Sequence, residues 1–415
     1  MLKMGNHIKL LMLLLGAAPA CGQDNAAVPF YVYEQSIDTE DKTITLQSKK
    51  QYHFAAKGIT VDNQFEGARL NNAQLSGNTL KVVIAPENTP VNGSSWYAFR
   101  IRSRKAQTVT IELNYTYSTH RYLPRVSTDQ KEWTVISKQK LKLNKAGDRA
   151  SFTLNLSAGT TWVAAQEIVP SSAVYDWCEM LGPSSHVHNR IIGKSVLGKD
   201  IPCLDIYGGG KNDKPIIALL GRHHPPEVPG HYALQYFVER LLSHNKANDF
   251  FKKYRVLVFP LINPDGVDLG HWRHNAAGVD LNRDYAQYQQ PEIKSLTTFL
   301  AKEASENDAP VLMGLDFHAT YEDVFYTSQE TEGVALAAFK DQWLNAIRHA
   351  LRAYDHQLKE EQHSVNSNPS AQHWFYHQFK ALGITYEVGD NTERAFIKTK
   401  AEVSADALIK LLIED

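Results

Sequence analysis

Two histidines and two glutamates, spread over three distant segments of the chain, are of the residue types found in catalytic zinc sites. His224 and Glu227 lie three positions apart, His318 follows much later, and Glu387 lies nearer the C-terminus. Catalytic zinc is usually held by three protein ligands of the His and Glu type, which leave a fourth position open for water. The bound ion acidifies that water into a nucleophile at neutral pH. The two histidines and one glutamate could hold zinc while the other glutamate works beside it, so these residues predict hydrolytic chemistry.

The segments around these residues predict a domain that can bring them together. From about residue 170, apolar runs typical of buried strands alternate with segments of helical spacing. This alternation favours an α/β domain with a mixed, largely parallel sheet. Active sites in open sheets of this kind lie at the carboxyl ends of the strands. Three runs end at or near candidate residues: 216–220 before His224, 311–315 before His318, and 384–386 before Glu387. We therefore expect these side chains to meet at one edge of the sheet.

The first part of the chain has a different pattern. Over residues 28–167, short stretches such as 97–102 and 108–116 alternate between apolar and polar residues. A period of two is typical of strands with one buried face, and turn signals such as Asn92-Gly93 separate the stretches. We expect an antiparallel β-sandwich over 28–167 and a catalytic domain over 170–415.

Length and charge agree with two domains and give no sign of a nucleic-acid partner. The chain has 415 residues, of which 43% are apolar, and a formal net charge of −1. That length is enough for one large core or two ordinary ones. A net charge close to zero shows no overall bias toward nucleic acid or anionic membranes.

Residues 1–22 have the features of a secretory signal peptide. Lys3 and Lys9 precede the apolar run 10–15, and small residues follow it. The run is too short to span a bilayer, and no later segment has the roughly eighteen apolar residues needed for a transmembrane helix. We expect an exported protein, either periplasmic or an outer-surface lipoprotein.

The three cysteines leave two questions open. Cys21 directly follows Ala18-Pro-Ala20, so cleavage before it would leave a cysteine for a lipid anchor, although a bacterial lipobox usually has leucine where Ala18 stands. Cys178 and Cys203 could form a disulfide in an oxidising compartment or remain buried thiols.

Further motifs accompany the four candidate residues in the order in which the zinc metallocarboxypeptidase family has them. They are Ile192–Ser195, Asn263–Gly266, Trp272-Arg273 and Gly278–Arg283. On these residues, 185–415 resembles that family, which implies the carboxypeptidase A-like fold. The N-terminal part is similar to the β-sandwich that precedes the catalytic domain in the cytosolic carboxypeptidase branch. The residues that match there are Trp96–Phe99 and the stretch from Tyr122-Leu-Pro124 to Trp133.

The resemblance implies a single zinc ion and assigns its ligands. His224, Glu227 and His318 match the family's zinc ligands, and Asp280 matches the carboxylate that orients His224. A ligating imidazole keeps its tautomer and angle best when its other nitrogen donates to a carboxylate. His223, next to the first ligand, is expected to be a neighbouring pocket group, because a fourth protein ligand would displace the water.

The resemblance also assigns the catalytic and substrate-binding residues. Glu387 matches the general base, which takes a proton from the zinc-bound water and returns it to the leaving amine. Arg273 matches the residue that stabilises the oxyanion. Asn282 and Arg283 match the pair that holds the free carboxylate of a peptide, and a guanidinium suits a carboxylate because two parallel bonds fix its direction.

Two positions concern specificity. Val365 stands where the family usually has a mobile tyrosine, and a valine side chain cannot donate a hydrogen bond; Tyr326 could replace it, or the role could be unfilled. Gln372 matches the position that contacts the terminal side chain of the substrate. Since glutamine is neither acidic nor basic, a preference for basic terminal residues is not expected.

Together these features predict an exported zinc carboxypeptidase that hydrolyses the terminal amide bond of peptides, including peptides derived from peptidoglycan. One alternative is a zinc deacylase of the desuccinylase and aspartoacylase type, which shares a zinc site and an Asp-Leu-Asn-Arg stretch. Asn263–Gly266 and Trp272-Arg273 match peptidases better. The other alternative is an inactive, peptide-binding member of the family, against which the intact Glu387 argues.

Overall fold

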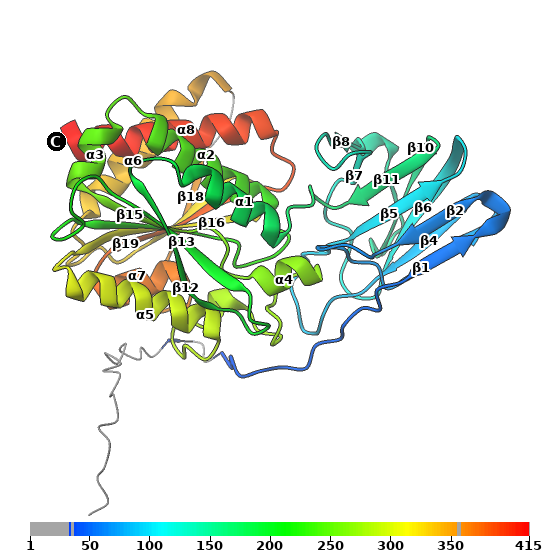
Figure 1. Cartoon of the computed structure of the whole chain (residues 1–415), viewed down its shortest axis with the longest axis horizontal. Helices are drawn as coiled ribbons and strands as arrows, with labels where there is room; N and C mark the ends of the chain where they lie inside the picture. The colour runs from blue at the N-terminus through cyan, green and yellow to red at the C-terminus, as the bar shows by residue number, and fades with distance from the viewer. Residues whose placement is uncertain (1–32, 35–36, 355–357, 415) are drawn as a thin grey trace, which may run out of the picture.

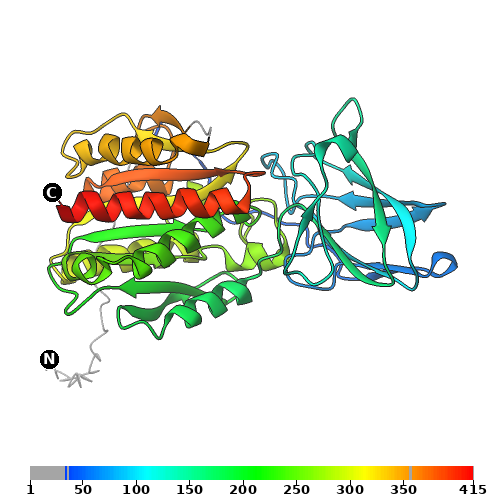
Figure 2. The same cartoon turned by 90° about the horizontal axis from the view of Figure 1, so that it is seen from above.

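The computed structural model describes residues 33–34, 37–354 and 358–414, which form two lobes (Figures 1 and 2). The predicted signal peptide and Cys21 lie outside the described residues. Within the described part of the chain, every helix is too short or too polar to cross a membrane. Cys178 and Cys203 are buried free thiols, which agrees with one of the two alternatives left open by the sequence.

The first lobe is a β-sandwich of two sheets. One sheet has the order β1 (Gln51–Phe54), β2 (Ile59–Asp62), β5 (Ala98–Ser103), β11 (Gly159–Ala164), β7 (Arg125–Ser127) and β8 (Thr134–Val135). The other has the order β3 (Asn72–Ser76), β4 (Thr79–Ile84), β6 (Gln107–Tyr115), β10 (Arg149–Leu156) and β9 (Lys142–Leu143). Short 3₁₀ helices lie at Ala55–Lys57 and Lys138–Lys140.

The predicted antiparallel sandwich is confirmed, with one parallel pair. In β6 the apolar residues at alternate positions are buried, as the period of two predicted. β4 and β6 run parallel because the chain leaves this sheet after β4, forms β5 in the opposite sheet and then returns as β6. Before β1, residues 37–50 contain no helix or strand and run along the second lobe, where the Thr39 hydroxyl donates to Asp284 (2.6 Å).

The second lobe is built on a mixed, largely parallel sheet, as predicted. Its order is β12 (Val187–Lys194), β13 (Asp200–Ile206), β15 (Arg255–Phe259), β14 (Ile216–Gly221), β16 (Val311–Thr320), β19 (Leu382–Gly389), β17 (Val324–Ser328) and β18 (Lys359–His363). The four central strands, from β15 to β19 in this order, are parallel to one another. These strands are almost wholly buried, which explains their continuous apolar runs.

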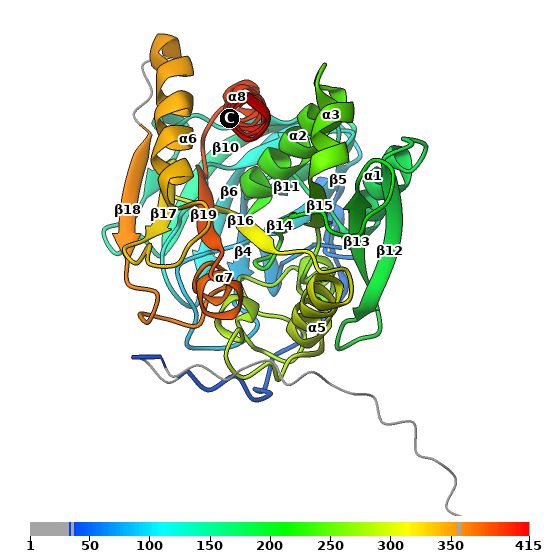
Figure 3. The same cartoon turned by 90° about the vertical axis from the view of Figure 1, so that its left-hand side faces the viewer.

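Helices cover both faces of this sheet (Figure 3). One face packs against α1 (Ser171–Leu181), α2 (Val228–Ser243), α3 (Ala247–Lys253), α6 (Ala337–Ala350) and α8 (Arg394–Glu414). The opposite face packs against α5 (Pro291–Glu306) and α7 (Ala371–Phe379). The short α4 (Pro264–Leu269) lies toward the sandwich, and 3₁₀ helices occur at Leu281–Arg283 and Arg352–Tyr354.

The two lobes are joined by polar contacts and by a shared core. The buried indole of Trp272, from the second lobe, belongs to the apolar core of the sandwich, and its Nε1 donates to the carbonyl of Trp96 (3.0 Å). Arg121 of the sandwich forms an ion pair with Asp390, which directly follows β19 (2.7 Å). Gly270 has a positive φ, and a side chain there would collide with the carbonyl of Ala68, so glycine permits this close approach.

Candidate active site

The carboxyl ends of three parallel strands deliver four of the predicted site residues to one place. His224 and Glu227 lie between β14 and α2, His318 lies in β16, and Glu387 lies opposite His318 in β19. The first turn of α2 comes close to β16 because Gly230 has no side chain, and a Cβ there would lie only 2.4 Å from the carbonyl oxygen of His318. Glu227, which immediately precedes α2, thereby reaches His318. We call these four residues the strand-end side of the site.

The Glu227 carboxylate faces both histidines. Its Oε1 lies 2.9 Å from Nδ1 of His224, and its Oε2 lies 2.7 Å from Nδ1 of His318. The other ring nitrogens also have carboxylate partners: His224 Nε2 lies 3.0 Å from Asp280, and His318 Nε2 lies 2.7 Å from Asp316. In the neutral tautomer that donates from Nε2, each histidine turns its Nδ1 lone pair toward Glu227.

This arrangement of electron-rich atoms fits a bound zinc ion. One ligand atom from each of His224, Glu227 and His318 lies within 4.8 Å of the others, and all three residues are buried. Lone pairs that face a carboxylate repel it unless a proton or a metal cation lies between them. Burial alone would raise the pKa of Glu227, but the two histidines hold it well below its usual value. Burial would likewise lower the pKa of His318, but Asp316 and Glu227 raise it well above its usual value. The set therefore attracts positive charge and has the ligand types and second carboxylates of zinc sites.

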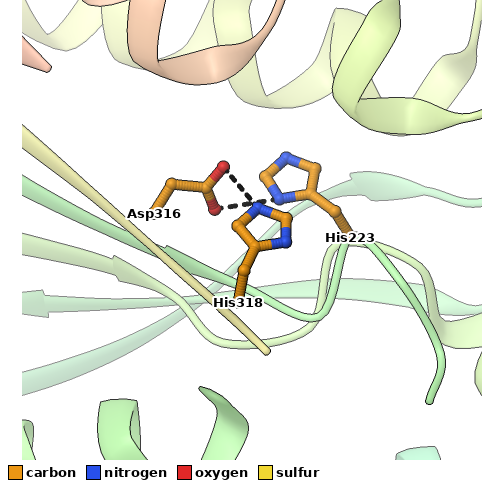
Figure 4. A group of neighbouring side chains, drawn as sticks. All are labelled: His223, Asp316 and His318. Carbon is orange, nitrogen blue, oxygen red and sulfur yellow. Dashed lines mark hydrogen bonds and ion pairs between the residues drawn. The ribbon is translucent and has the colours of Figure 1, made fainter. Parts of the chain in front are cut away.

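A second group, formed by His223, Asp316 and His318, also has the composition of a metal site (Figure 4). The rings of His223 and His318 are stacked, with their planes 8° apart, and Nδ1 of His223 lies 3.0 Å from Asp316. All three residues of the first group border the cavity that contains Glu387, whereas of the second group only the shared His318 does. His223 is fully buried, and its Nε2 lies 2.8 Å from the Tyr285 hydroxyl. We therefore interpret His223 and Asp316 as supports of His318.

Glu387 borders a cavity of about 260 Å³ beside this metal-binding group. Its Oε2 atom is buried and has no hydrogen-bond partner among the described residues. Burial raises the pKa of Glu387 to about 8, while the nearby His318 acts in the opposite direction. A carboxyl group with such a pKa can accept and release a proton close to neutral pH.

Three further residues border the cavity from a loop and a 3₁₀ turn outside the sheet, Arg273, Asn282 and Arg283, which we call the loop side. Nε of Arg273 donates to Asp280 (2.6 Å), whose other oxygen contacts His224, so one carboxylate links the two sides. Oδ1 of Asp280 also accepts from the backbone N–H of Asn282. Arg283 donates to the carbonyl of Asn282 (2.7 Å) and forms no ion pair with the described residues.

The structure also places the two residues expected to affect specificity. Gln372, at the start of α7, is buried beside the cavity, and its Oε1 accepts from the Thr385 hydroxyl (3.0 Å). Val365 is buried and does not border the cavity, whereas Tyr326 of β17 does. Burial, with a smaller contribution from Glu387, raises the pKa of Tyr326 to about 12, so its hydroxyl keeps its proton.

Sequence reasoning missed several residues at this site. Asn92 and Arg121 border the cavity although both belong to the sandwich. Nothing in their spacing points to a site in the other lobe. Asp316 was given no role, although its position two residues before His318 in a strand places both side chains on one face. The remaining cavity residues are Ala319, Thr320, His363, Asn368, Ser370, His373 and Thr385.

Comparison with known proteins agrees with the geometry of this site. The zinc carboxypeptidase family matches residues 174–409, which is more than half of the chain. The chain belongs to the zinc carboxypeptidase family. The N-terminal domain of cytosolic carboxypeptidases matches residues 61–165, so the resemblance inferred from the sequence is confirmed for both lobes of this zinc carboxypeptidase family member.

Individual relatives are distant. An uncharacterized protein of Zymomonas mobilis is 24% identical over 59% of this chain and 64% of its own length. Mouse cytosolic carboxypeptidase 6 is 27% identical over 31% of this chain and 25% of its own length. The matches thus span less than two thirds of these relatives.

Solved structures share the fold of both lobes. A metallo-carboxypeptidase from Burkholderia cenocepacia matches with a TM-score of 0.71 and 17% identity, over 86% of this chain and 98% of its own. A metallo-carboxypeptidase from Pseudomonas aeruginosa, in complex with (2-guanidinoethylmercapto)succinic acid, matches with a TM-score of 0.69 and 18% identity. The match covers 85% of this chain and 98% of the Pseudomonas chain. At these identities the likeness concerns the fold.

Proposed function

We propose that the protein is a zinc-dependent carboxypeptidase that removes the C-terminal residue of peptides. The observation that carries this proposal is the single cavity in which His224, Glu227 and His318 meet Glu387 and Arg283. A metal-binding group, a base and a cation that can bind a carboxylate are the parts needed for hydrolysis at the end of a peptide chain. Membership in the zinc carboxypeptidase family supports the same conclusion.

Zinc bound by His224, Glu227 and His318 would supply an acidified water and polarise the substrate carbonyl. Glu387 borders the same cavity as this group, so we assign it the role of general base. It would take the proton of the attacking water and return it to the leaving amine. Its Oε2, which has no partner among the described residues, is available for this transfer.

Arg273 and Arg283 have separate tasks in this proposal. Arg273 is held through its Nε by Asp280, which leaves its terminal nitrogens to stabilise the negative oxygen of the tetrahedral intermediate. Arg283, with Asn282, would bind the free carboxylate of the substrate. Because a carboxylate held there lies in the same cavity as the metal-binding group, the bond presented for cleavage is the last one of the chain.

The alternatives are less well supported by the site. The match of residues 174–409 to the zinc carboxypeptidase family favours a peptidase over a deacylase of the desuccinylase and aspartoacylase type. An inactive binding protein does not need a carboxyl group whose pKa is raised toward neutrality, as that of Glu387 is. The signal-like residues 1–22 support export, and exported carboxypeptidases meet peptides released from the cell wall, so we include these among the proposed substrates.

A panel of peptides tests this proposal, with each sequence prepared both as the free acid and as the C-terminal amide. Mass spectrometry after incubation with the zinc-loaded enzyme should show loss of one terminal residue from the acids alone. The Glu387→Gln variant serves as the control. Cleavage of acids and amides alike would contradict the role of Arg283, and cleavage of N-acyl amino acids but of no peptide would favour the deacylase.

A further inference from the structure

The segment that bears Arg273 is held in place by a carboxylate of the sandwich. Glu87 lies in the loop after β4 and is fully buried. Its Oε2 accepts from the backbone N–H of Trp272 (2.7 Å), and its Oε1 accepts from those of Arg273 (3.0 Å) and His274 (2.9 Å). One side chain from the first lobe thus satisfies three successive backbone donors in the second.

Ionised carboxylates make the strongest hydrogen bonds of this kind, and Glu87 is ionised. Against burial, the neighbouring His274 and Arg69 hold the pKa of Glu87 well below its usual value. Nδ1 of His274 lies 3.0 Å from Oε1. Charge-assisted bonds are about twice as strong as those between neutral groups and fix the positions of the donors more closely. Three of them leave the backbone of Arg273 little freedom.

The sandwich also holds the residues that precede Arg273. Arg69 donates to the carbonyl of Gly270 (2.7 Å), and the indole of Trp272 is buried in the sandwich core. From Arg273 the contacts continue to Asp280 (2.6 Å) and then to His224 (3.0 Å). An uninterrupted series of polar contacts therefore leads from Glu87 to a proposed zinc ligand.

We propose that Glu87 is a positioning residue for catalysis, through which the β-sandwich fixes Arg273 at the oxyanion site. The inference rests on the proposed carboxypeptidase function. It gives the sandwich a part in the reaction, beyond covering the catalytic lobe. A displacement of about 1 Å in a catalytic group can lower the rate by about 10²-fold, so losing these bonds should affect turnover.

The test compares Glu87→Gln with Glu167→Gln in the full-length, zinc-loaded enzyme. Glu167 is also a sandwich carboxylate at the interface between the lobes, but it pairs with Arg394, away from the Arg273 segment. We expect Glu87→Gln to lower kcat by about 10- to 100-fold with KM within about threefold and zinc content unchanged. Glu167→Gln should leave kcat near that of the wild type.

A double-mutant cycle separates positioning from a general loss of structure. If Glu87 acts through Arg273, Glu87→Gln should have little further effect on kcat when Arg273 is already alanine. The proposal would be overturned if Glu87→Gln lowered kcat equally in the wild-type and Arg273→Ala backgrounds, or if it left kcat unchanged. It would also be overturned if Glu167→Gln lowered kcat as much as Glu87→Gln does.

Glu87→Asp is the second variant, because it keeps the charge but withdraws the oxygens from the backbone donors. It should lower kcat less than Glu87→Gln does. If neither variant folds, Glu87 is a structural residue and the proposal is wrong. A wild-type enzyme inert toward all peptide acids would instead refute the proposed function, whereas equal activity of the wild type and Glu87→Gln would refute only this inference.

Discussion

The strand-end side and the loop side of the cavity differ in what holds their residues in place. His224, Glu227, His318 and Glu387 stand at the ends of buried parallel strands, so the core of the catalytic lobe fixes their backbone. Arg273 lies on a loop whose backbone N–H is bound by Glu87 of the sandwich, and Asn282 and Arg283 lie in a 3₁₀ turn capped by Asp280. The metal-binding half of such a site is thus specified by the fold of one domain, whereas the substrate-binding half depends on contacts with its surroundings.

The strongest expected effect is on the strand-end side. Glu387→Gln should lower kcat/KM by about 10³-fold, because the amide cannot accept the proton of the water. Zinc content, measured by elemental mass spectrometry, should remain at one ion per chain. Loss of zinc together with activity would instead make Glu387 a ligand and would contradict the assigned division of roles.

On the loop side, Arg273→Ala should lower kcat by about 10²- to 10³-fold, the loss typical of removing one oxyanion donor. Steady-state kinetics on a peptide acid would measure it. Arg273→Lys is the matched variant and should recover only part of the rate, since lysine cannot contact Asp280 and the oxyanion at once. A raised KM with a normal kcat would show that Arg273 stabilises the bound substrate as much as the transition state, which would contradict its role at the oxyanion.

Asp280 belongs to both sides, so its removal tests their connection. Asp280→Asn should weaken zinc binding about 10- to 100-fold, because His224 loses the carboxylate that orients its ring. Competition with a chelator would measure the affinity. Asp268→Asn serves as the control, since Asp268 pairs with Lys199 and touches no ligand. An unchanged zinc affinity would mean that the strand ends alone fix His224.

The smallest effect concerns the stability of the loop side. Burial raises the pKa of Glu292 to about 7, and its side chain accepts from Asn275, whose Oδ1 holds the loop at Val279. A raised carboxyl pKa means that the folded protein binds the proton more tightly than the unfolded chain. The associated stability is present below about pH 4.5 and is lost as the pH rises through about 7.

Glu292→Gln should remove this dependence. At pH 8 the variant should be more stable than the wild type, by at most roughly 3 kcal/mol for a pKa displaced this far. At pH 4 the two should be alike. Thermal unfolding of both proteins across this range would measure the difference, and parallel stability curves would contradict the raised pKa.

The same contrast explains how much the sequence could predict. His224 and Glu227 were found because their spacing of three at a strand-to-helix junction is a local pattern, and the fold class followed from the change between period-two and α/β patterning. Asn92 and Arg121 reach the cavity, and Glu87 reaches the backbone of Arg273, only through the packing of one lobe on the other. No rule of spacing relates a sandwich loop to a strand end far along the chain.

The residues expected to affect specificity were likewise only partly predictable from the sequence, although they all belong to the catalytic lobe. Counting along the chain identified Val365 as a departure from the family pattern, and this residue does not border the cavity. That Tyr326 lies at the cavity instead depends on the pairing of β17 with β19, which places it opposite Thr385. Strand order in a mixed sheet is set by tertiary packing, so the sequence left this choice open.

The burial of Trp272 in the sandwich core has a consequence for the evolution of this protein. A catalytic lobe that lends an indole to its neighbour's core cannot exchange that neighbour freely. A chimera carrying the sandwich of a distant relative should fold poorly unless the segment 269–274 is transferred with it. The unit that recombination can move intact is therefore the pair of lobes, with the interface inherited as a whole.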